Sequence, residues 1–501
     1  MTLAATAEDA SFDPRTGERT GAVPHSTPDD VSRILHRASG AASVLAGLNP
    51  AIREGWLAAA SASVLAASAE LVDLARSETG LGVARLEGEL ARMAASARFY
   101  GAVAREGSYL AVSRDDLDGG STIVRGNLPL GVVGVFGASN FPFGFGIFGH
   151  DVASALAAGC PVVVKAHPAH PRLSVRLGQV VRDALAASSA PEGTFDVVVG
   201  FDSGLQLVDS PLVRAVAFTG SQQAGMALVE RGARRGIPVF AEMGTVNPVF
   251  VSPAAATDRD VIAQGFVDSF TLGAGQFCTK PGLILVPAGH GFVESITTCV
   301  ARVAEEPLLT AGIAAAYRRG LAELDPHTAP DPRITPDPPA AAGYAVAPRV
   351  IAVSLDQLVP GSRLLDECFG PVALVAEYDT VAGALAALDR LQPSLAGSVF
   401  SGADGDEDAV AAIAQLAPRV GRVAVNAWPT GVATTWSQQH GGPWPATSRP
   451  DATSVGAAGL ARFVRPVSLQ NATSIQLPPM LQPQNPWNLP RRLNGRLVPC
   501  E

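Results

Sequence analysis

Apolar positions recur with helical spacing between residues 28 and 105. The stretches DDVSRILHRASGAASVLAGL and RLEGELARMAASARFYGAV are rich in Ala, Leu, Glu and Arg, and their apolar residues follow a period close to that of an α-helix. This pattern predicts a helical opening section.

From Gly126 onward the pattern changes to short apolar runs that end in turn residues. The runs are LGVVGVFG, CPVVVKAHP, FDVVVG and VRAVAFTGS, and helix-like segments such as HDVASALAAG lie between them. Such alternation is typical of βαβ units and a parallel sheet. A second region of the same kind runs from NPVFVS to GRVAVN, near residue 426. The pattern therefore predicts an α/β fold.

Two proline-rich stretches interrupt these regions. Residues 324–344, LDPHTAPDPRITPDPPAAAGY, are expected to form a surface loop. Residues 477–495, LPPMLQPQNPWNLPRRLNG, cannot form a long helix because proline breaks the hydrogen-bond ladder. We expect this second stretch to lie across another surface, that of a neighbouring subunit being one candidate.

Composition narrows the class of protein. A chain of 501 residues exceeds one ordinary core, so two or three domains are expected. Hydrophobic residues make up 47% and charged residues 17%, which suits a large α/β enzyme or an oligomer. The net charge of -9 comes without any Lys/Arg-rich run, which argues against a nucleic-acid partner.

The N-terminus and the cysteines bear on location. The first 21 residues lack the basic start and apolar block of a signal peptide, and no apolar run reaches the length of a membrane span. We expect a cytoplasmic protein without a membrane partner. The five cysteines are scattered, which disfavours disulfides and zinc knuckles and predicts reduced thiols; they are Cys160, Cys278, Cys299, Cys368 and Cys500.

Two motifs suggest chemistry. In GAGQFCTKPG, Cys278 stands between a glycine-rich approach and a Lys-Pro-Gly exit, so it is either a nucleophile or a buried hydrophobe. In FTGSQQAG, an apolar strand leads into Gly220 and Ser221, which open a helix, with Gly225 one turn in. A helix N-terminus favours an anion such as a cofactor phosphate, although an ordinary strand-to-helix turn has the same pattern.

Six motifs occur in the order and at about the spacings of the aldehyde dehydrogenase superfamily, which the chain resembles from about residue 10 to 470. They are LPLGVVGVFGASNFPFGF, AAGCPVVVKAHPAHP, VAFTGSQQAG, AEMGTVNPVFV, GAGQFCTKPGL and LLDECFGPV. GASNFPF, KAHPAHP and AEMGTVNP most resemble the branch of NADP-using and α-ketoglutaric semialdehyde dehydrogenases. The resemblance implies NAD(P)-dependent oxidation of an aldehyde to a carboxylic acid through a cysteine thiohemiacetal and thioester, with α-ketoglutaric semialdehyde as the expected substrate.

The resemblance assigns three catalytic residues, and each assignment makes chemical sense. Cys278 matches the family nucleophile, and a thiolate is the side chain best suited to form the adduct that precedes hydride loss. Asn140 matches the asparagine whose amide donates to the oxyanion, although an asparagine before Phe-Pro also suits a turn. Glu242 matches the general base that activates water to release the acid, its other interpretation being a surface glutamate at a strand end.

Other matches concern the cofactor. Lys165 matches the lysine that binds the adenosine ribose, and Glu367 with Phe369 match the pair that holds the nicotinamide ribose. Pro168 stands where many NAD-preferring relatives carry a glutamate, so the carboxylate that would repel a 2′-phosphate is missing and NADP is favoured over NAD. GFDSG supplies Asp202 but no arginine to clamp that phosphate, which leaves NAD open.

Several rival interpretations remain at this stage. His167 and His170 are three apart, but the neighbouring prolines prevent the helix that would aim both at one metal, so no metal site is expected. Cys278 with His440 of SQQHGG could form a cysteine hydrolase dyad. An inactive binding protein is a further alternative. An aldehyde dehydrogenase of broad specificity is another, because Ser139 stands where relatives frequently carry a tryptophan that shapes the aldehyde tunnel.

The resemblance also implies an architecture. Residues 1–107 and 129–246 are expected to form a Rossmann-like cofactor domain, and residues 247–463 an α/β catalytic domain. Residues 108–128 and 464–501 should form a bridging element in a homodimer or homotetramer. If the substrate carries an ω-carboxylate, Arg92 in GELARM is a candidate partner for it, although a solvated helix arginine is the simpler interpretation.

Overall fold

The computed structural model describes residues 7–324, 343–402 and 405–499, and the opening section is helical as the periodicity predicts. Helix α1 begins with a capping box: Thr27 accepts from the Asp30 N–H, and the Asp30 carboxylate accepts from the Thr27 N–H. The section comprises the hairpin β1 (Glu8–Phe12) and β2 (Arg19–Pro24), then α1 (Pro28–Ala46), α2 (Pro50–Ala66), α3 (Ser68–Thr79) and α4 (Val83–Glu106).

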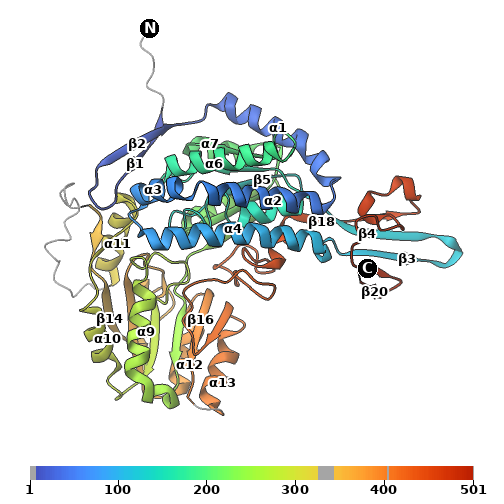
Figure 1. Ribbon diagram of the computed structural model, residues 1–501. Helices are drawn as coiled ribbons and strands as arrows, with labels where there is room; N and C mark the ends of the chain where they lie inside the picture. Colours follow the sequence, from blue (N-terminus) through green and yellow to red (C-terminus); the bar gives the residue numbers. More distant parts are fainter. Residues whose placement is uncertain (1–6, 325–342, 403–404, 500–501) are drawn as a thin grey trace, which may run out of the picture.

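The first βαβ region forms a five-stranded parallel sheet in the order β7-β6-β5-β8-β9. Helices α2 to α6 pack on one face, and α1, α7 and α8 on the other (Figure 1). The elements are β5 (Val132–Phe136), α5 (His150–Ala158), β6 (Val162–Lys165), α6 (Pro171–Ala187), β7 (Phe195–Val198), α7 (Phe201–Asp209), β8 (Val213–Gly220), α8 (Gln222–Ala233) and β9 (Val239–Met243).

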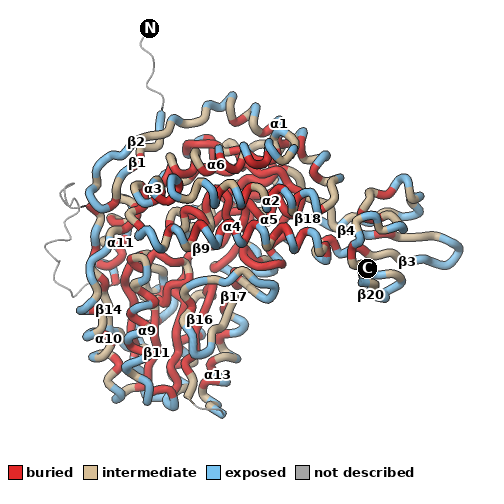
Figure 2. The backbone as a smooth tube through the Cα atoms, viewed as in Figure 1, coloured by how far each residue is buried: buried red, intermediate tan, exposed pale blue. Residues whose placement is uncertain are grey.

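The second βαβ region forms a six-stranded parallel sheet in the order β14-β15-β11-β10-β16-β17. Helices α9 and α10 cover one face and α12 and α13 the other, so its central strands are buried (Figure 2). The elements are β10 (Pro248–Val251), α9 (Arg259–Thr271), β11 (Leu283–Pro287), α10 (Phe292–Val300), β14 (Arg349–Ser354), β15 (Val372–Tyr378), α12 (Val381–Arg390), β16 (Ser394–Phe400), α13 (Glu407–Leu416) and β17 (Val420–Val425). Three further elements fall between α10 and β14 in the chain: β12 (Glu306–Pro307), α11 (Ala311–Leu324) and β13 (Ala345–Val346), of which β12 and β13 pair with each other.

A third sheet joins segments far apart in the chain and projects from the rest (Figure 1). Its order is β18-β4-β3-β19-β20, from β3 (Val112–Asp116), β4 (Thr122–Pro129), β18 (Val464–Gln470), β19 (Arg491–Leu493) and β20 (Arg496–Val498). Both segments predicted to bridge subunits thus pair with each other. The bridging role and the domain boundaries stay predictions.

The second proline-rich stretch contains no long helix, as expected, and lies across its own chain. Met480, Leu481 and Leu489 are buried against Leu110 and Val124 of the third sheet and its flank. The predicted surface loop of residues 324–344 falls almost entirely outside the described residues.

No single helix among the described residues is long and apolar enough to cross a membrane. Helices α2 and α3 reach that length and composition only as a pair, which bends by 71° at the break between them.

Candidate active site

A cavity of about 1310 Å³ opens beside the carboxyl ends of β5, β6, β8 and β9. Ligands of open α/β sheets bind at this edge, because the loops that follow the strands form a crevice there. All but one of the residues predicted for the site line the cavity; these are Asn140, Lys165, Gly220, Ser221, Glu242, Cys278, Glu367 and Phe369.

Gly225 is the exception, because its place is in the packing of α8 on the sheet. A Cβ at this position would lie 2.7 Å from Met243 Sδ on β9, so a larger residue would displace the Met243 side chain. Ser221 caps the same helix, its hydroxyl accepting from the Ala224 N–H at 3.3 Å. The predicted helix N-terminus is therefore present and faces the cavity, while Gly225 serves the approach of helix to sheet.

The loop that carries Cys278 is held on several sides. Gly273 and Gly275 have φ of +58° and +67°, which allows the tight turn before the cysteine. The Asn247 side chain donates to the Cys278 carbonyl at 2.8 Å. The buried Lys280 ammonium donates to the carbonyls of Cys368 at 2.9 Å and Val372 at 2.7 Å, which ties the loop to the segment after Glu367.

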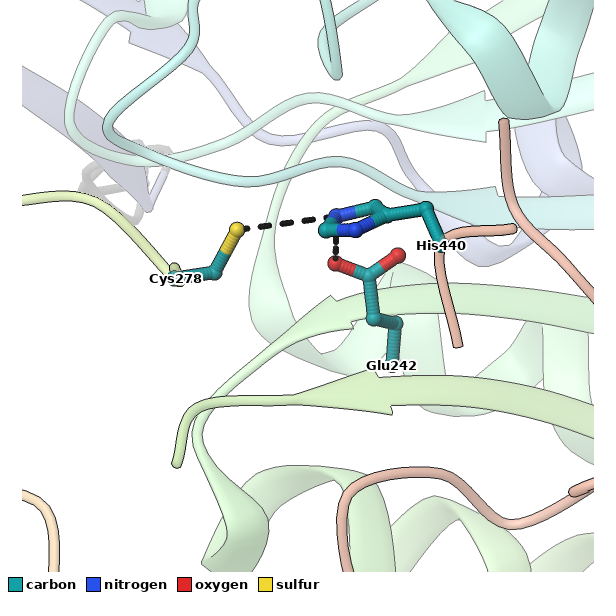
Figure 3. A group of neighbouring side chains, drawn as sticks. All are labelled: Glu242, Cys278 and His440. Atoms are coloured by element: carbon teal, nitrogen blue, oxygen red, sulfur yellow. Dashed lines mark hydrogen bonds and ion pairs between the residues drawn. The ribbon is translucent and has the colours of Figure 1, made fainter. Parts of the chain in front are cut away.

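Three side chains from distant parts of the chain meet, and two of them, Glu242 and Cys278, line the cavity (Figure 3). The Cys278 Sγ lies 3.7 Å from His440 Nε2, and the same nitrogen lies 2.8 Å from Glu242 Oε1. Ser454 donates a hydrogen bond to Glu242 Oε2, whereas Oε1 accepts no aligned hydrogen bond from any described residue. His440 and Glu242 are only 1% and 4% exposed, so their charges interact with little screening.

The electrostatics of this group follow from burial and from the neighbours. Burial raises the pKa of Cys278 well above its ordinary value, and the carboxylates of Glu242 and Glu367 act in the same direction. Burial also works to raise the pKa of Glu242, but His440, Ser454 and Arg462 outweigh it and leave that pKa lowered. The structure therefore holds a carboxylate beside His440 and a thiol that needs a proton acceptor to ionise.

Asn140 is oriented by the same loop. Its Nδ2 donates to the Gln276 carbonyl at 2.7 Å, two residues before Cys278. Arg85 on α4 donates to the Asn140 carbonyl at 2.8 Å, and its guanidinium lies 5.4 Å and 4.9 Å from the rings of Phe141 and Phe277. The amide of Asn140 is thus fixed next to the cysteine, with its second N–H free for another acceptor.

Two charged residues predicted for the cofactor, Lys165 and Glu367, also line the cavity. Burial lowers the pKa of Lys165 and brings the pKa of His167 well below its ordinary value. Burial raises the pKa of Glu367 to about 7, and Arg363 donates to the Glu367 carbonyl at 3.2 Å. Lysine and glutamate therefore lie in one cavity as the sequence motifs predict.

Other predicted residues lie elsewhere. Arg92 is exposed on α4 and Asp202 is exposed on α7, and neither lines the cavity. The rings of His167 and His170 are 5.5 Å apart, but they do not belong to the one group of metal-ligand side chains found among the described residues, which is Glu242, Cys278 and His440.

His440 is the main residue that the sequence interpretation misplaced. It entered there only as the partner of Cys278 in a hydrolase dyad. The structure does bring the two together, but Glu242 and Cys278 contact the same ring nitrogen. In a hydrolase triad the acid orients the imidazole through the other nitrogen. The arrangement therefore favours a shared pocket of three groups over a hydrolase triad.

A Rossmann-like sheet with a cavity at its strand ends and a cysteine in the cavity lining is typical of α/β oxidoreductases of the dinucleotide-binding kind. The chain belongs to the aldehyde dehydrogenase family, whose family model matches residues 4–312 and 330–444. The predicted fold and the prediction of an aldehyde-oxidising enzyme are thereby confirmed.

Curated relatives cover nearly the whole chain. It is 40% identical to "Alpha-ketoglutaric semialdehyde dehydrogenase 2" of Azospirillum brasilense, over 97% of this chain and 95% of that protein. It is 36% identical to "Alpha-ketoglutaric semialdehyde dehydrogenase" of Acinetobacter baylyi, over 86% and 84% of the two chains.

Solved structures share the fold. An NAD-dependent aldehyde dehydrogenase from Sinorhizobium meliloti is 25% identical with a TM-score of 0.79, over 94% of this chain and 92% of that one. An E. coli NADP dependent enzyme is 21% identical with a TM-score of 0.79, over 93% and 95%. One of these proteins is described as NAD-dependent and the other as NADP dependent. Membership of the family supports a nicotinamide cofactor here, and these two structures do not separate NAD from NADP.

Proposed function

We propose that this enzyme oxidises α-ketoglutaric semialdehyde to 2-oxoglutarate with NADP or NAD, through a thioester on Cys278. The observation that carries the chemistry is the group of Glu242, Cys278 and His440, two of which line a cavity of about 1310 Å³. The substrate is inferred from the two curated relatives, whose names both specify this semialdehyde.

Thiol activation is the first step. His440 Nε2 lies within hydrogen-bonding range of Cys278 Sγ, so it accepts the thiol proton as the thiolate attacks the aldehyde carbon. The ionised Glu242 carboxylate 2.8 Å away stabilises the imidazolium that results. This pathway compensates for the burial that raises the pKa of the thiol.

The next steps convert the adduct to the acid. The oxyanion accepts a hydrogen bond from the free N–H of the Asn140 amide, a neutral donor that stabilises negative charge without giving up a proton. A bound nicotinamide supplies the hydride acceptor for this collapse to the thioester. Glu242 then takes a proton from water as the water attacks the thioester carbonyl, which releases the carboxylic acid and regenerates Cys278.

The polar side chains that line the cavity suit a nicotinamide cofactor. We assign Lys165 to the adenosine ribose, and Glu367 with Phe369 to the nicotinamide ribose; all three residues line the cavity. Pro168 supplies no carboxylate to repel a 2′-phosphate, although Asp9 acts on the pKa of Lys165. His167 is neutral at physiological pH, so Lys165 supplies the positive charge there. We therefore favour NADP slightly over NAD.

Cofactor binding should depend on the ionisation of Glu367. Ribose hydroxyls donate more strongly to a carboxylate than to a neutral acid, and the pKa of this group is about 7 in the free enzyme. Cofactor affinity is therefore expected to rise as the pH rises from about 6 to 8 and Glu367 loses its proton, by up to about tenfold per pH unit below the pKa. Calorimetry should show this slope, and Glu367→Gln should flatten it; an unchanged slope in that variant would exclude Glu367 as its source.

The proposed substrate carries a carboxylate that needs a cationic partner. Arg422 on β17 is partly buried and is not among the residues that line the cavity, but the charge of Cys278 acts on its pKa, so we propose its guanidinium as this partner. One of its nitrogens donates to the carbonyls of Pro429 and Gly431, and the others carry further N–H donors. Arg85 is less suited, because its guanidinium is enclosed by Phe141 and Phe277.

Purified enzyme should therefore be assayed with α-ketoglutaric semialdehyde, aliphatic aldehydes and aromatic aldehydes, each with NAD and NADP. Arg422→Leu is expected to lower the ratio of kcat/KM for the charged over the neutral aldehydes by about 10- to 100-fold, the scale of a charge-assisted contact. Arg92→Leu, an exposed arginine on α4, is the matched control and should leave the ratio unchanged. Equal efficiency for all three classes in the wild type would support broad specificity instead.

A further inference from the structure

We propose that Cys278, His440 and Glu242 form a reversible inhibitory site for a zinc-like divalent cation. The inference goes beyond aldehyde oxidation, because it concerns what else the three side chains can bind when substrate is absent. It also revises the expectation from sequence that the chain holds no metal site.

The donor set matches the chemistry of zinc. Zn²⁺ binds thiolate, imidazole nitrogen and carboxylate oxygen, and open zinc sites use three protein ligands with a fourth position left for water. The three side chains offer one such atom each, and these atoms all lie within 4.8 Å of one another. Magnesium and calcium are disfavoured, because they prefer sites made of oxygen ligands only.

The distances fit as well as the donors. Tetrahedral zinc with ordinary bond lengths separates sulfur from nitrogen by about 3.5 Å and nitrogen from oxygen by about 3.3 Å. The observed separations are 3.7 Å for Sγ to Nε2 and 2.8 Å for Nε2 to Oε1. All three ligand atoms lie within 4.8 Å of one another, so rotations of the Cys278 and Glu242 side chains would complete the site.

Access and available lone pairs support binding. Cys278 and Glu242 line the cavity, so an ion that enters it reaches both. Glu242 Oε1 is buried and accepts no aligned hydrogen bond from a described residue, so it has a lone pair free for a cation. Ser454 donates to the other carboxylate oxygen, and the backbone N–H of His440 donates to Thr453 Oγ1 at 2.8 Å, so the Glu242 carboxylate and the main chain that carries the imidazole are held in place beforehand.

Binding would stop the enzyme for a simple reason. The cation replaces the proton of the Cys278 thiol, which is released to solvent, and the sulfur lone pair that attacks the aldehyde is then shared with the metal. Glu242 and His440 lose their proton-accepting atoms in the same event. A chelator that removes the ion restores all three groups, so inhibition is reversible and the bound thiol is shielded from alkylating agents.

The test uses full-length enzyme stripped with a chelator, and its first readout needs neither aldehyde nor nicotinamide. Titration with Co²⁺, a spectroscopic substitute for Zn²⁺, should give a thiolate-to-metal absorption band that saturates near one ion per chain. Zn²⁺ in a chelator buffer should displace the Co²⁺, slow the alkylation of Cys278 by iodoacetamide and abolish turnover. Excess EDTA should reverse all three effects.

Variants separate this site from other thiols. His440→Ala and Glu242→Gln should each weaken Zn²⁺ binding by more than about 100-fold, since even outer ligands of zinc sites contribute 10- to 100-fold. Cys299→Ala, which removes a half-exposed thiol on α10, should bind as the wild type does. Unfolding midpoints of all variants are compared first, so that a folding defect is not taken for lost binding.

Two results would overturn the site. One is a Co²⁺ band that persists in Cys278→Ala, and the other is Zn²⁺ inhibition of equal strength in the wild type and His440→Ala. Because the band is recorded without substrate or cofactor, an enzyme that failed to oxidise the proposed semialdehyde could still bind the ion. Failure of the metal site and failure of the proposed function are therefore distinguishable.

Discussion

Replacing Cys278 with alanine is expected to lower aldehyde oxidation by at least about 10⁴-fold, because it removes the thiol that the structure holds beside Glu242 and His440 and that forms the covalent adduct before hydride loss. Cofactor binding should persist, since Lys165, Glu367 and Phe369 line the cavity independently of the thiol. Steady-state assays give the loss of turnover, and calorimetric titration with each nicotinamide gives the retained affinity.

Cys299→Ala serves as the matched control for this experiment. Cys299 lies on α10, packs at the margin of the second sheet and does not line the cavity, so its removal should leave turnover at the wild-type level. Substantial turnover in Cys278→Ala would contradict the assigned nucleophile, and loss of cofactor binding in that variant would mean that the thiol also shapes the cofactor site.

Much of the fold could be predicted because its signals are local. The helices α1 to α4 and the strands of both parallel sheets follow from apolar periodicity and from runs that end in turn residues. The third sheet was not predicted, because it pairs two segments of the chain that lie more than 300 residues apart. Strand β4 pairs with β18 from Ile123 with Gln470 to Pro129 with Val464. Its strands are largely polar or half-buried, so no apolar run marks them.

In the candidate site, too, residues within local motifs could be predicted, whereas contacts between distant residues could not. Asn140, Glu242 and Cys278 stand in short motifs with recognisable neighbours, and the fold brings all three to one cavity. The contact of His440 with Glu242 could not be read from the sequence, because 197 intervening residues separate them and only the folded loop places the imidazole 2.8 Å from the carboxylate. Gly225 differs in the opposite way: it belongs to a motif predicted to bind the cofactor, but in the structure it packs α8 against the sheet.

Glu242→Gln is expected to separate the two halves of the reaction. The amide keeps the size of the side chain and an oxygen for the Ser454 hydrogen bond but cannot accept a proton, so water attack on the thioester should slow by roughly 10²- to 10⁴-fold. Loss of the carboxylate also leaves the His440 imidazolium without its partner at 2.8 Å, which slows thiolate formation. Since His440 remains to take the thiol proton, we expect the first half-reaction to suffer less.

Rapid mixing should then show a burst of reduced cofactor near one equivalent per active site, followed by very slow turnover. Mass spectrometry should find the acyl group on the peptide that contains Cys278. Ser454→Ala is the matched control: it removes a hydrogen bond to Glu242 but keeps the base, so we expect a loss of about tenfold without an accumulated adduct. If Glu242→Gln folds normally yet gives neither burst nor adduct, the carboxylate acts before hydride transfer, and its main task is to hold the charge on His440 while Cys278 ionises.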